Sequence, residues 1–195
     1  MSFSLLCPSV SNIANLSNST GASNITTFQH RIRSLTQDER RGADNNAPAH
    51  RAHSDFTKNG AVHHFERTIK DPAERRRLLN SGVMLINVWR PLKTITKDPL
   101  AVCDWSTVDV KADLEGYRMI VPNDWHELGK INYSKKQKWC YLSGQRPDEP
   151  LVFTQWDSRN EDGFTLPHSA FVHPEFVDHD PRESIEIKMF VFLHN

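Results

Sequence analysis

His53 and Asp55 form an H-x-D pair, a spacing at which an imidazole and a carboxylate can bind one metal ion. On an extended segment, residues two apart project to the same face of the chain. A non-haem iron site of the 2-His-1-carboxylate type needs one further histidine and leaves positions open for a co-substrate and O2. His168, in the segment LPHSAF, is the best candidate for that ligand. These three residues predict an Fe(II) site.

Two other H-x-[DE] pairs compete with this one. Ten histidines and 24 acidic residues among 195 predict roughly one such pair by chance, and the sequence contains three, so the tripeptide alone is weak evidence. His64 and Glu66 lie in the stretch AVHHFERTI, which we expect to be helical, so that their side chains diverge. His173 and Glu175 lie in a proline-rich connection, where a fixed ligand geometry is unfavourable. The pair at residues 53 and 55 is therefore preferred.

Arg182 lies just before the last predicted strand and could bind the co-substrate. A guanidinium can hold the distal carboxylate of 2-oxoglutarate through two parallel hydrogen bonds. If residues 169–172 and 182–193 pair as a hairpin, Arg182 falls roughly 10 Å along from His168, which suits the length of 2-oxoglutarate. The alternative is a surface ion pair with Asp180 or Glu183, which would contribute little.

The elements that must position these residues are mostly short extended runs, separated by clusters of Pro, Gly, Asn and Asp. Seven of them predict a sandwich or jelly roll. They span residues 83–89, 100–104, 118–122, 138–142, 151–156, 169–172 and 184–193, and residues 25–35 could add another. The last run is apolar on both faces, as expected for a strand covered on both sides.

The clearest predicted helix begins at Asp71 and ends near Gly82. Asp71 suits the N-cap position, Pro72 suits N1 and Glu74 suits N3. Residues 1–24 are polar and unpatterned and predict a disordered leader, while residues 37–52 predict a loop. We expect residues 25–195 to form a single domain.

Composition limits the classes of partner. Lysine plus arginine and aspartate plus glutamate number 24 each, so the chain has no basic surplus for binding nucleic acid. No apolar stretch approaches the roughly 18 to 20 residues of a membrane span. Three cysteines without CxxC spacing suggest neither disulfides nor a thiolate zinc site. We expect a cytoplasmic protein with a small-molecule partner; the oligomeric state is open, and a dimer is compatible with the sequence.

Longer strings surround the candidate ligands and are more specific than H-x-D. In chain order they are TGA at 20–22 with FQH at 28–30, AHSDFTKNGA at 52–61, INVWRPL at 86–92, DPLAVCD at 98–104, KWCYLSGQRPDEPLVFTQWDS at 138–158, LPHSAFVHP at 166–174 and PRESIEIKMFVF at 181–192. Their content and order resemble the fungal AsaB-type hydroxylase/desaturase family, which is related to bacterial cephem methoxylase subunits and to a fungal gibberellin desaturase.

The resemblance implies a mainly β, cupin-like double-stranded β-helix with a few short helices, and Fe(II)/2-oxoglutarate chemistry with O2. The implied role is hydroxylation or desaturation of a small molecule in fungal secondary-metabolite biosynthesis. It implies that His53, Asp55 and His168 bind the metal and that Arg182 binds the co-substrate. It also singles out pocket candidates without individual roles: Asn87, Trp89, Arg90, Gln155, Asp157 and Ser158.

Family members carry a longer portion before the TGA segment than this sequence does. We therefore expect part of the usual substrate wall or sheet edge to be absent, which weakens a β-rich domain. Two other functions stay open. One is a metal-dependent, cupin-like isomerase or lyase that does not use 2-oxoglutarate, and the other is a non-catalytic accessory or binding subunit.

Aromatic residues and one arginine carry further expectations. Trp89, Trp156, Phe190 and Phe192 are expected in the core, because aromatic residues dominate buried area in small β domains. Arg90 follows the apolar run INVW, so we expect it near the core with a carboxylate partner.

Overall fold

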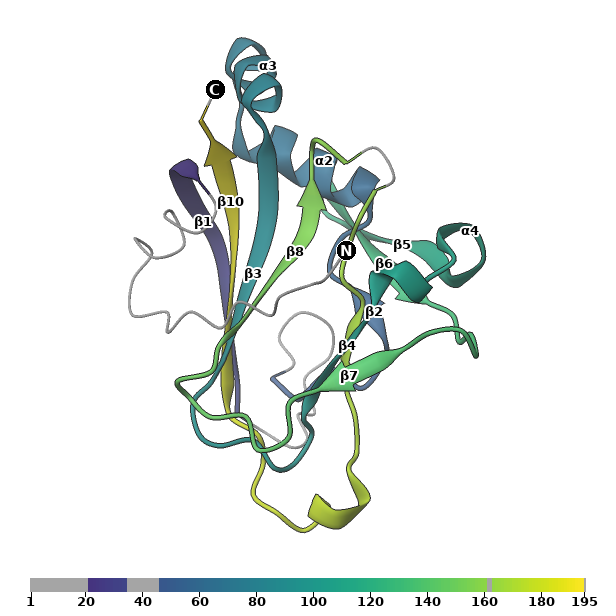
Figure 1. Ribbon diagram of the computed structural model, residues 1–195. Coiled ribbons are helices and arrows are strands. Elements are labelled where there is room, and N and C mark those ends of the chain that lie inside the picture. The colour runs from purple at the N-terminus through teal and green to yellow at the C-terminus, as the bar shows by residue number, and fades with distance from the viewer. Residues whose placement is uncertain (1–20, 35–45, 161–162, 195) are drawn as a thin grey trace.

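The computed structural model describes residues 21–34, 46–160 and 163–194, and within them the chain folds into two antiparallel sheets that face each other (Figure 1). The first sheet has the order β1 (Ala22–Arg33), β10 (Ser184–Leu193), β3 (Val83–Pro91) and β8 (Leu151–Asp157). The second has the order β5 (Leu114–Val121), β6 (Asp124–Ile131), β2 (His53–Ser54), β9 (His168–Ala170), β4 (Leu100–Cys103) and β7 (Trp139–Tyr141). The prediction of a mainly β jelly roll is confirmed.

β10 lies between β1 and β3, and its two faces have different roles. Met189 and Val191 are buried on the outer face of the sheet, where they pack with residues of β3. Phe190 is fully buried on the inner face and packs against the helices. Closer to the start of the strand, the inner face carries the charged residues Glu186 and Lys188. The predicted coverage of both faces is therefore confirmed.

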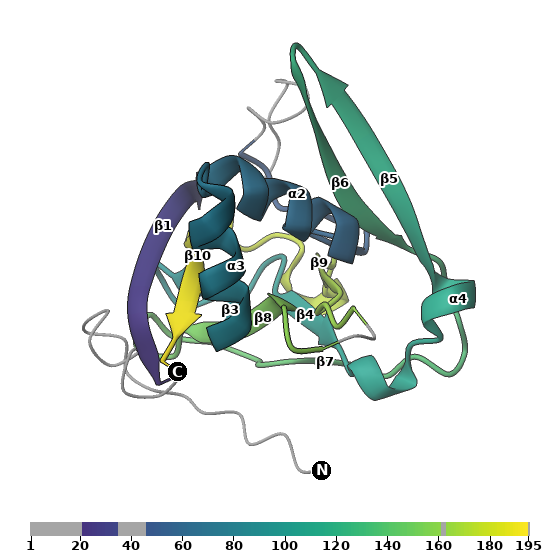
Figure 2. The same ribbon diagram turned by 90° about the horizontal axis from the view of Figure 1, so that it is seen from above.

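Two helices, α2 (Lys58–Thr68) and α3 (Pro72–Ser81), cover one end of the sandwich, as Figure 2 shows from above. The Asp71 side chain accepts a hydrogen bond from the Ala73 amide, and Gly82 ends α3 with φ of 107°. The predicted caps are thus confirmed. Beneath the helices lies the main core cluster, which contains Phe56, Ala61, Phe65, Leu78, Val83, Leu85, Trp156, Phe190 and Phe192. The core positions predicted for Trp156, Phe190 and Phe192 are confirmed.

Shorter helical turns lie in the connections between strands. They are the 3-10 helices η2 (Trp105–Thr107) and η3 (Pro174–Phe176) and the single-turn helix α4 (Val110–Asp113). None of the helices in the described ranges is both long and apolar enough to cross a membrane.

The predicted hairpin between residues 169–172 and 182–193 is wrong. β9 pairs with β2 and β4, whereas β10 pairs with β1 and β3 in the opposite sheet. The connection through η3 therefore crosses from one sheet to the other. His168 and Arg182 consequently approach each other across the sandwich and not along one hairpin.

Other element boundaries also differ from expectation. β6 was missed because its sequence, DWHELGKI, lacks regular alternation; it forms by pairing with β5 around a turn in which Asn123 has φ of 62°. The expected leader, residues 1–24, lies largely outside the described residues. Its last part already belongs to β1, since Ala22 pairs with Leu193, and this pairing with a distant strand is invisible in the local sequence.

Candidate metal centre

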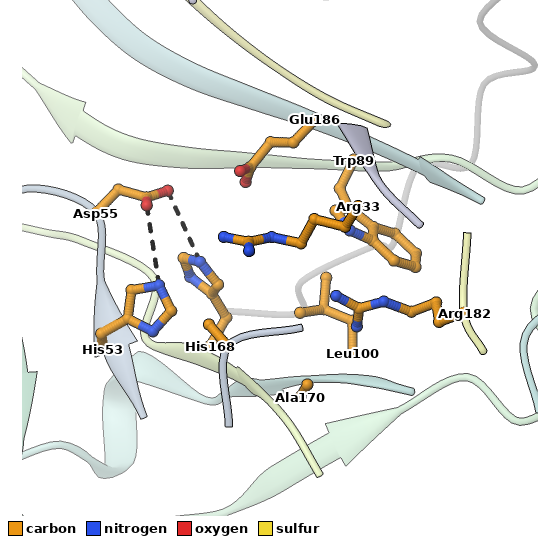
Figure 3. Close-up of a pocket in the computed structure, with 10 residues that line it drawn as sticks. Arg33, His53, Asp55, Trp89, Leu100, His168, Ala170, Arg182 and Glu186 are labelled. Atoms are coloured by element: carbon orange, nitrogen blue, oxygen red, sulfur yellow. Dashed lines mark ion pairs between the residues drawn. The ribbon is translucent and has the colours of Figure 1, made fainter. Parts of the chain in front are cut away.

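His53 and His168 are cross-strand partners in β2 and β9, with ring centroids 4.6 Å apart. Asp55 follows β2 directly and turns its carboxylate toward both rings (Figure 3). The Nε2 atom of His53 lies 3.9 Å from one carboxylate oxygen, and Nε2 of His168 lies 3.7 Å from the other. One donor atom from each of the three residues falls within 4.8 Å of the others. The predicted ligands are thus brought together.

Backbone carbonyls orient the two imidazoles. His53 Nδ1 lies 2.8 Å from the Arg51 carbonyl, and His168 Nδ1 lies 3.0 Å from the Leu166 carbonyl. Because a carbonyl can only accept, each Nδ1 carries the proton and each Nε2 presents a lone pair toward Asp55. Burial lowers the pKa of His53 to about 4 and also lowers the pKa of His168. Both rings are therefore in the neutral form that binds metals.

Asp55 is buried and held at several atoms. Lys188 Nζ lies 2.6 Å from Oδ1, Asn87 Nδ2 donates to Oδ2 at 2.5 Å, and the Asp55 amide donates to Gln155 Oε1 at 3.0 Å. Burial alone would raise the pKa of Asp55, but Lys188 and the two histidines hold it well below its usual range. The carboxylate is therefore ionised and fixed in orientation.

Arg182 reaches the same cavity, which has a volume of about 30 Å³. Its Nη1 donates to the Asp98 carbonyl at 2.8 Å, and its guanidinium lies 5.4 Å from the centre of the Trp89 ring. Burial lowers the pKa of Arg182 to about 10, so it stays charged at neutral pH. Its Nε is buried and has no hydrogen-bond partner in the described part of the chain, which leaves a donor available to an anion.

Two further charged residues line this cavity and were missed by sequence reasoning: Arg33 and Glu186. Figure 3 shows Arg33 and Arg182 reaching in from the same side, with Arg33 extending further toward His168. The charges of Glu186 and Lys188 alternate with apolar residues in the string SIEIKMF, which is a signal for inward-facing charges on a covered strand. Arg33 offers no such local signal.

Three of the predicted pocket residues lie at or beside the triad. Trp89 is 3% exposed and lines the cavity as well as the core. Asn87 and Gln155 are buried and contact Asp55 without lining the cavity. Gln155 is itself fixed, because its Nε2 donates to the Leu166 carbonyl at 3.1 Å. These two amides therefore act on the site through Asp55.

The remaining pocket candidates lie elsewhere. Arg90 is exposed and its Nε donates to the Pro147 carbonyl at 2.9 Å, so the prediction of a buried arginine with a carboxylate partner is wrong. The reason is strand alternation, which turns Arg90 away from the face that carries Trp89. Asp157 pairs with Arg159 at 2.7 Å, and Ser158 accepts from the Val83 amide at 2.9 Å. Their contacts are structural.

The donor set fits a divalent transition metal. Two neutral imidazole nitrogens and one ionised carboxylate converge from one side, which is the 2-His-1-carboxylate arrangement of non-haem Fe(II) enzymes. The residues present are therefore compatible with Fe(II), and the free Arg182 donor is compatible with an anionic co-substrate.

Comparison with known proteins agrees with this donor set. A family model described as an oxidoreductase/YMDC permease-like domain matches residues 7–192. The hydroxylase/desaturase CTB9 of Cercospora beticola is 32% identical over 195 residues, covering 89% of this chain and 59% of that protein. The chain belongs to the family described by this oxidoreductase domain model.

Other proteins are similar to this chain over much of its length. The hydroxylase/desaturase asaB of Aspergillus flavus is 36% identical over 138 residues, covering 63% of this chain and 60% of that protein. A solved structure of a variant of the iron and alpha-ketoglutarate-dependent endoperoxidase NvfI matches with a TM-score of 0.79 at 30% identity, covering 93% of this chain and 65% of that one. The chain thus spans less than two thirds of each of these relatives.

Proposed function

We propose that this chain is an Fe(II)/2-oxoglutarate-dependent oxygenase that hydroxylates or desaturates a small molecule in fungal secondary-metabolite biosynthesis. One observation carries the proposal: a 2-His-1-carboxylate cluster and a buried arginine with a free donor share one cavity. Relatives named as Fe(II)/2-oxoglutarate-dependent dioxygenases and as hydroxylase/desaturases support it.

His53, Asp55 and His168 would hold Fe(II), and Arg182 would bind the distal carboxylate of 2-oxoglutarate. Iron held there would supply oxidation of a C–H bond by O2, coupled to conversion of 2-oxoglutarate into succinate and CO2. The protein contributes position and charge. Asn87 and Lys188 fix the carboxylate of Asp55, and the backbone carbonyls fix the rings. Burial of the whole group limits access of water.

The charge of the cavity favours a dianion. Two guanidiniums, from Arg33 and Arg182, line it together with one carboxylate besides Asp55, that of Glu186. Burial raises the pKa of Glu186, with Asp55 adding to the rise. A dicarboxylate such as 2-oxoglutarate therefore finds cations at the side of the cavity opposite the histidines.

Uncoupled turnover tests the proposal without knowledge of the substrate. The chain is incubated with Fe(II), ascorbate and 2-oxoglutarate in air, and succinate is measured. We expect succinate from the wild type, and in Arg182→Ala a requirement for about a hundredfold more 2-oxoglutarate, as removal of one member of a buried charge pair costs several kcal/mol. High 2-oxoglutarate should restore turnover.

Arg90→Ala is the matched control, because Arg90 is exposed and binds only a loop carbonyl. It should behave like the wild type. No succinate from the wild type, or unchanged 2-oxoglutarate dependence in Arg182→Ala, would contradict the assignment.

The cytoplasmic location is part of the same proposal and rests on cysteine usage. Fractionation of cells that express a tagged chain would test it.

A further inference from the structure

Lys188 is a buried lysine on β10 whose ammonium crosses the sandwich to the candidate metal ligand Asp55. It is 8% exposed, and its Nζ lies 2.6 Å from Asp55 Oδ1. Buried lysines are rare unless paired, because transfer of a charge out of water is costly. Here the pair joins the four-stranded sheet to the segment that carries the metal ligands.

Asn87 completes the hold on Asp55. It lies directly opposite Lys188 in the pairing of β3 with β10, so both side chains project from neighbouring positions of one sheet. Lys188 binds Oδ1 and Asn87 Nδ2 binds Oδ2. Each carboxylate oxygen therefore already has one partner on the side that faces the four-stranded sheet, and the histidines lie on the other side.

Glu186 offers a second acceptor to the same two donors. Its Oε2 lies 3.9 Å from Lys188 Nζ, and its Oε1 accepts from Asn87 Nδ2 at 3.0 Å. Glu186 lies two residues before Lys188, on the same face of β10. Lys188 is thus shared between two buried carboxylates, Asp55 and Glu186.

A metal dication and the Lys188 ammonium would both neutralise Asp55. Their charges repel each other at such short range in a buried site. In the protein without metal, the ammonium supplies the positive charge that a buried carboxylate requires. When a metal supplies that charge, the interaction of Lys188 with Asp55 becomes less favourable. Glu186 then remains as the partner of Lys188.

We propose that Lys188 is a built-in counter-ion for Asp55, which neutralises this ligand in the metal-free protein and is retained by Glu186 when metal binds. Lys188 is then a positioning residue that lowers metal affinity below what the three ligands alone would give. In return, the metal-free chain folds without an unpaired buried carboxylate. This inference rests on the proposed function, since it requires a metal at His53, Asp55 and His168.

Co(II) binding and thermal unfolding of Lys188→Met test the inference, because methionine keeps most of the side-chain length and removes the charge. Without metal, we expect a lower Tm than in the wild type. With saturating Co(II), we expect a larger rise in Tm, and Co(II) affinity should increase at least about tenfold. A purely structural role would lower Tm equally with and without metal and leave the Co(II)-induced rise unchanged.

Two further variants sharpen the test. Glu186→Gln leaves the ammonium with Asp55 as its only carboxylate partner, so Co(II) binding should weaken, the opposite sign to Lys188→Met. This variant also serves if Lys188→Met does not fold. Lys130→Met is the control, because Lys130 pairs with Glu115 at an exposed site and should change neither measurement.

The failures are distinguishable. If the wild type takes up no Co(II), the proposed metal site is wrong and this inference with it. If the wild type binds Co(II) but Lys188→Met shows an equal or smaller Co(II)-induced rise in Tm, only the counter-ion role is wrong. The same conclusion follows if Glu186→Gln binds Co(II) as tightly as the wild type.

Discussion

Gly60 in α2 lies directly against the backbone of Glu127 in β6. A Cβ atom built on Gly60 would fall 2.3 Å from the Glu127 carbonyl oxygen, far inside van der Waals contact. The Thr57 side chain caps the same end of α2 by accepting from the Gly60 amide at 3.1 Å, and its hydroxyl donates to the Glu127 carboxylate at 2.5 Å. This contact sets the distance between the helix and the sheet that carries β2.

Gly60→Ala should therefore destabilise the protein, although alanine normally favours a helix by about 1 kcal/mol over glycine. Because the clash is with backbone and not with a flexible side chain, we expect a loss of about 1–3 kcal/mol in the free energy of unfolding. Urea denaturation measures it. Asn59→Ala, at an exposed position of the same helix, is the control and should change stability little. A Gly60→Ala protein as stable as the wild type would refute the close packing.

His64 should make stability depend on pH. It lies on α2 among Phe28, Phe56 and Phe190, and burial, followed by the charges of His126 and Arg67, lowers its pKa from 6.5 to about 4. Between these two values the unfolded chain binds a proton that the folded chain does not. The contribution of neutral His64 to the free energy of unfolding is thus fully present above pH 6.5 and is lost as the pH falls toward 4.

His64→Leu should remove this contribution. Between pH 7.5 and pH 5, we expect the loss in free energy of unfolding to be smaller in the variant by about 1 kcal/mol, because solvent partly screens this half-buried group. Urea denaturation at the two pH values measures the difference. His179→Leu, at an exposed position, should keep the wild-type dependence. Identical pH dependence in His64→Leu and the wild type would show that His64 is not the group responsible.

Arg33 should contribute to co-substrate binding. Its guanidinium extends into the cavity beside His168 and Arg182 (Figure 3), and the cavity of about 30 Å³ holds little more than a water molecule. Entry of 2-oxoglutarate therefore requires side chains that line the cavity to shift, and we expect Arg33 to pair with the incoming dianion. Arg33→Leu should weaken 2-oxoglutarate binding about tenfold and change Co(II) binding little.

Calorimetric titration of the Co(II)-loaded protein with 2-oxoglutarate checks this prediction. Arg31→Leu is the matched control, because Arg31 lies two residues earlier on β1 but does not line the cavity. It should bind 2-oxoglutarate like the wild type. Equal or tighter binding by Arg33→Leu would mean that Arg33 only fills the cavity and does not recognise the dicarboxylate.

Local signals predicted the elements that carry strong patterns. The cap at Asp71, the alternation of β10 and the apolar run of β3 are all properties of neighbouring residues. β2 and β6 were not predicted, because β2 has only two residues and the sequence of β6 is polar. Both strands form through pairing with their neighbours. Tertiary pairing, and not propensity, determines such strands.

Among the site residues, too, some are indicated by the local sequence and others depend on tertiary pairing. H-x-D by itself was one of three pairs. An expected helix and a proline-rich connection disfavoured the other two, and the surrounding strings then supported His53 and Asp55. Lys188 sits in an apolar strand where its charge could have been noticed. Arg33 could not be found, because its place in the cavity depends on pairing of β1 with β10, which joins the two ends of the described chain. Contacts of this kind leave no trace in the local sequence.

Anaerobic titration with Fe(II) and then 2-oxoglutarate, followed by visible absorption, shows directly whether His53, Asp55 and His168 bind iron together with the co-substrate. The wild type should develop the weak charge-transfer band of 2-oxoglutarate chelated to Fe(II), saturating at one equivalent of metal. His168→Ala should not develop it, because one of three ligands is lost. His173→Ala, which removes a partly buried histidine outside the cluster, should behave like the wild type. Absence of the band in the wild type, or an equal band in His168→Ala, would show that these residues do not form the proposed iron site.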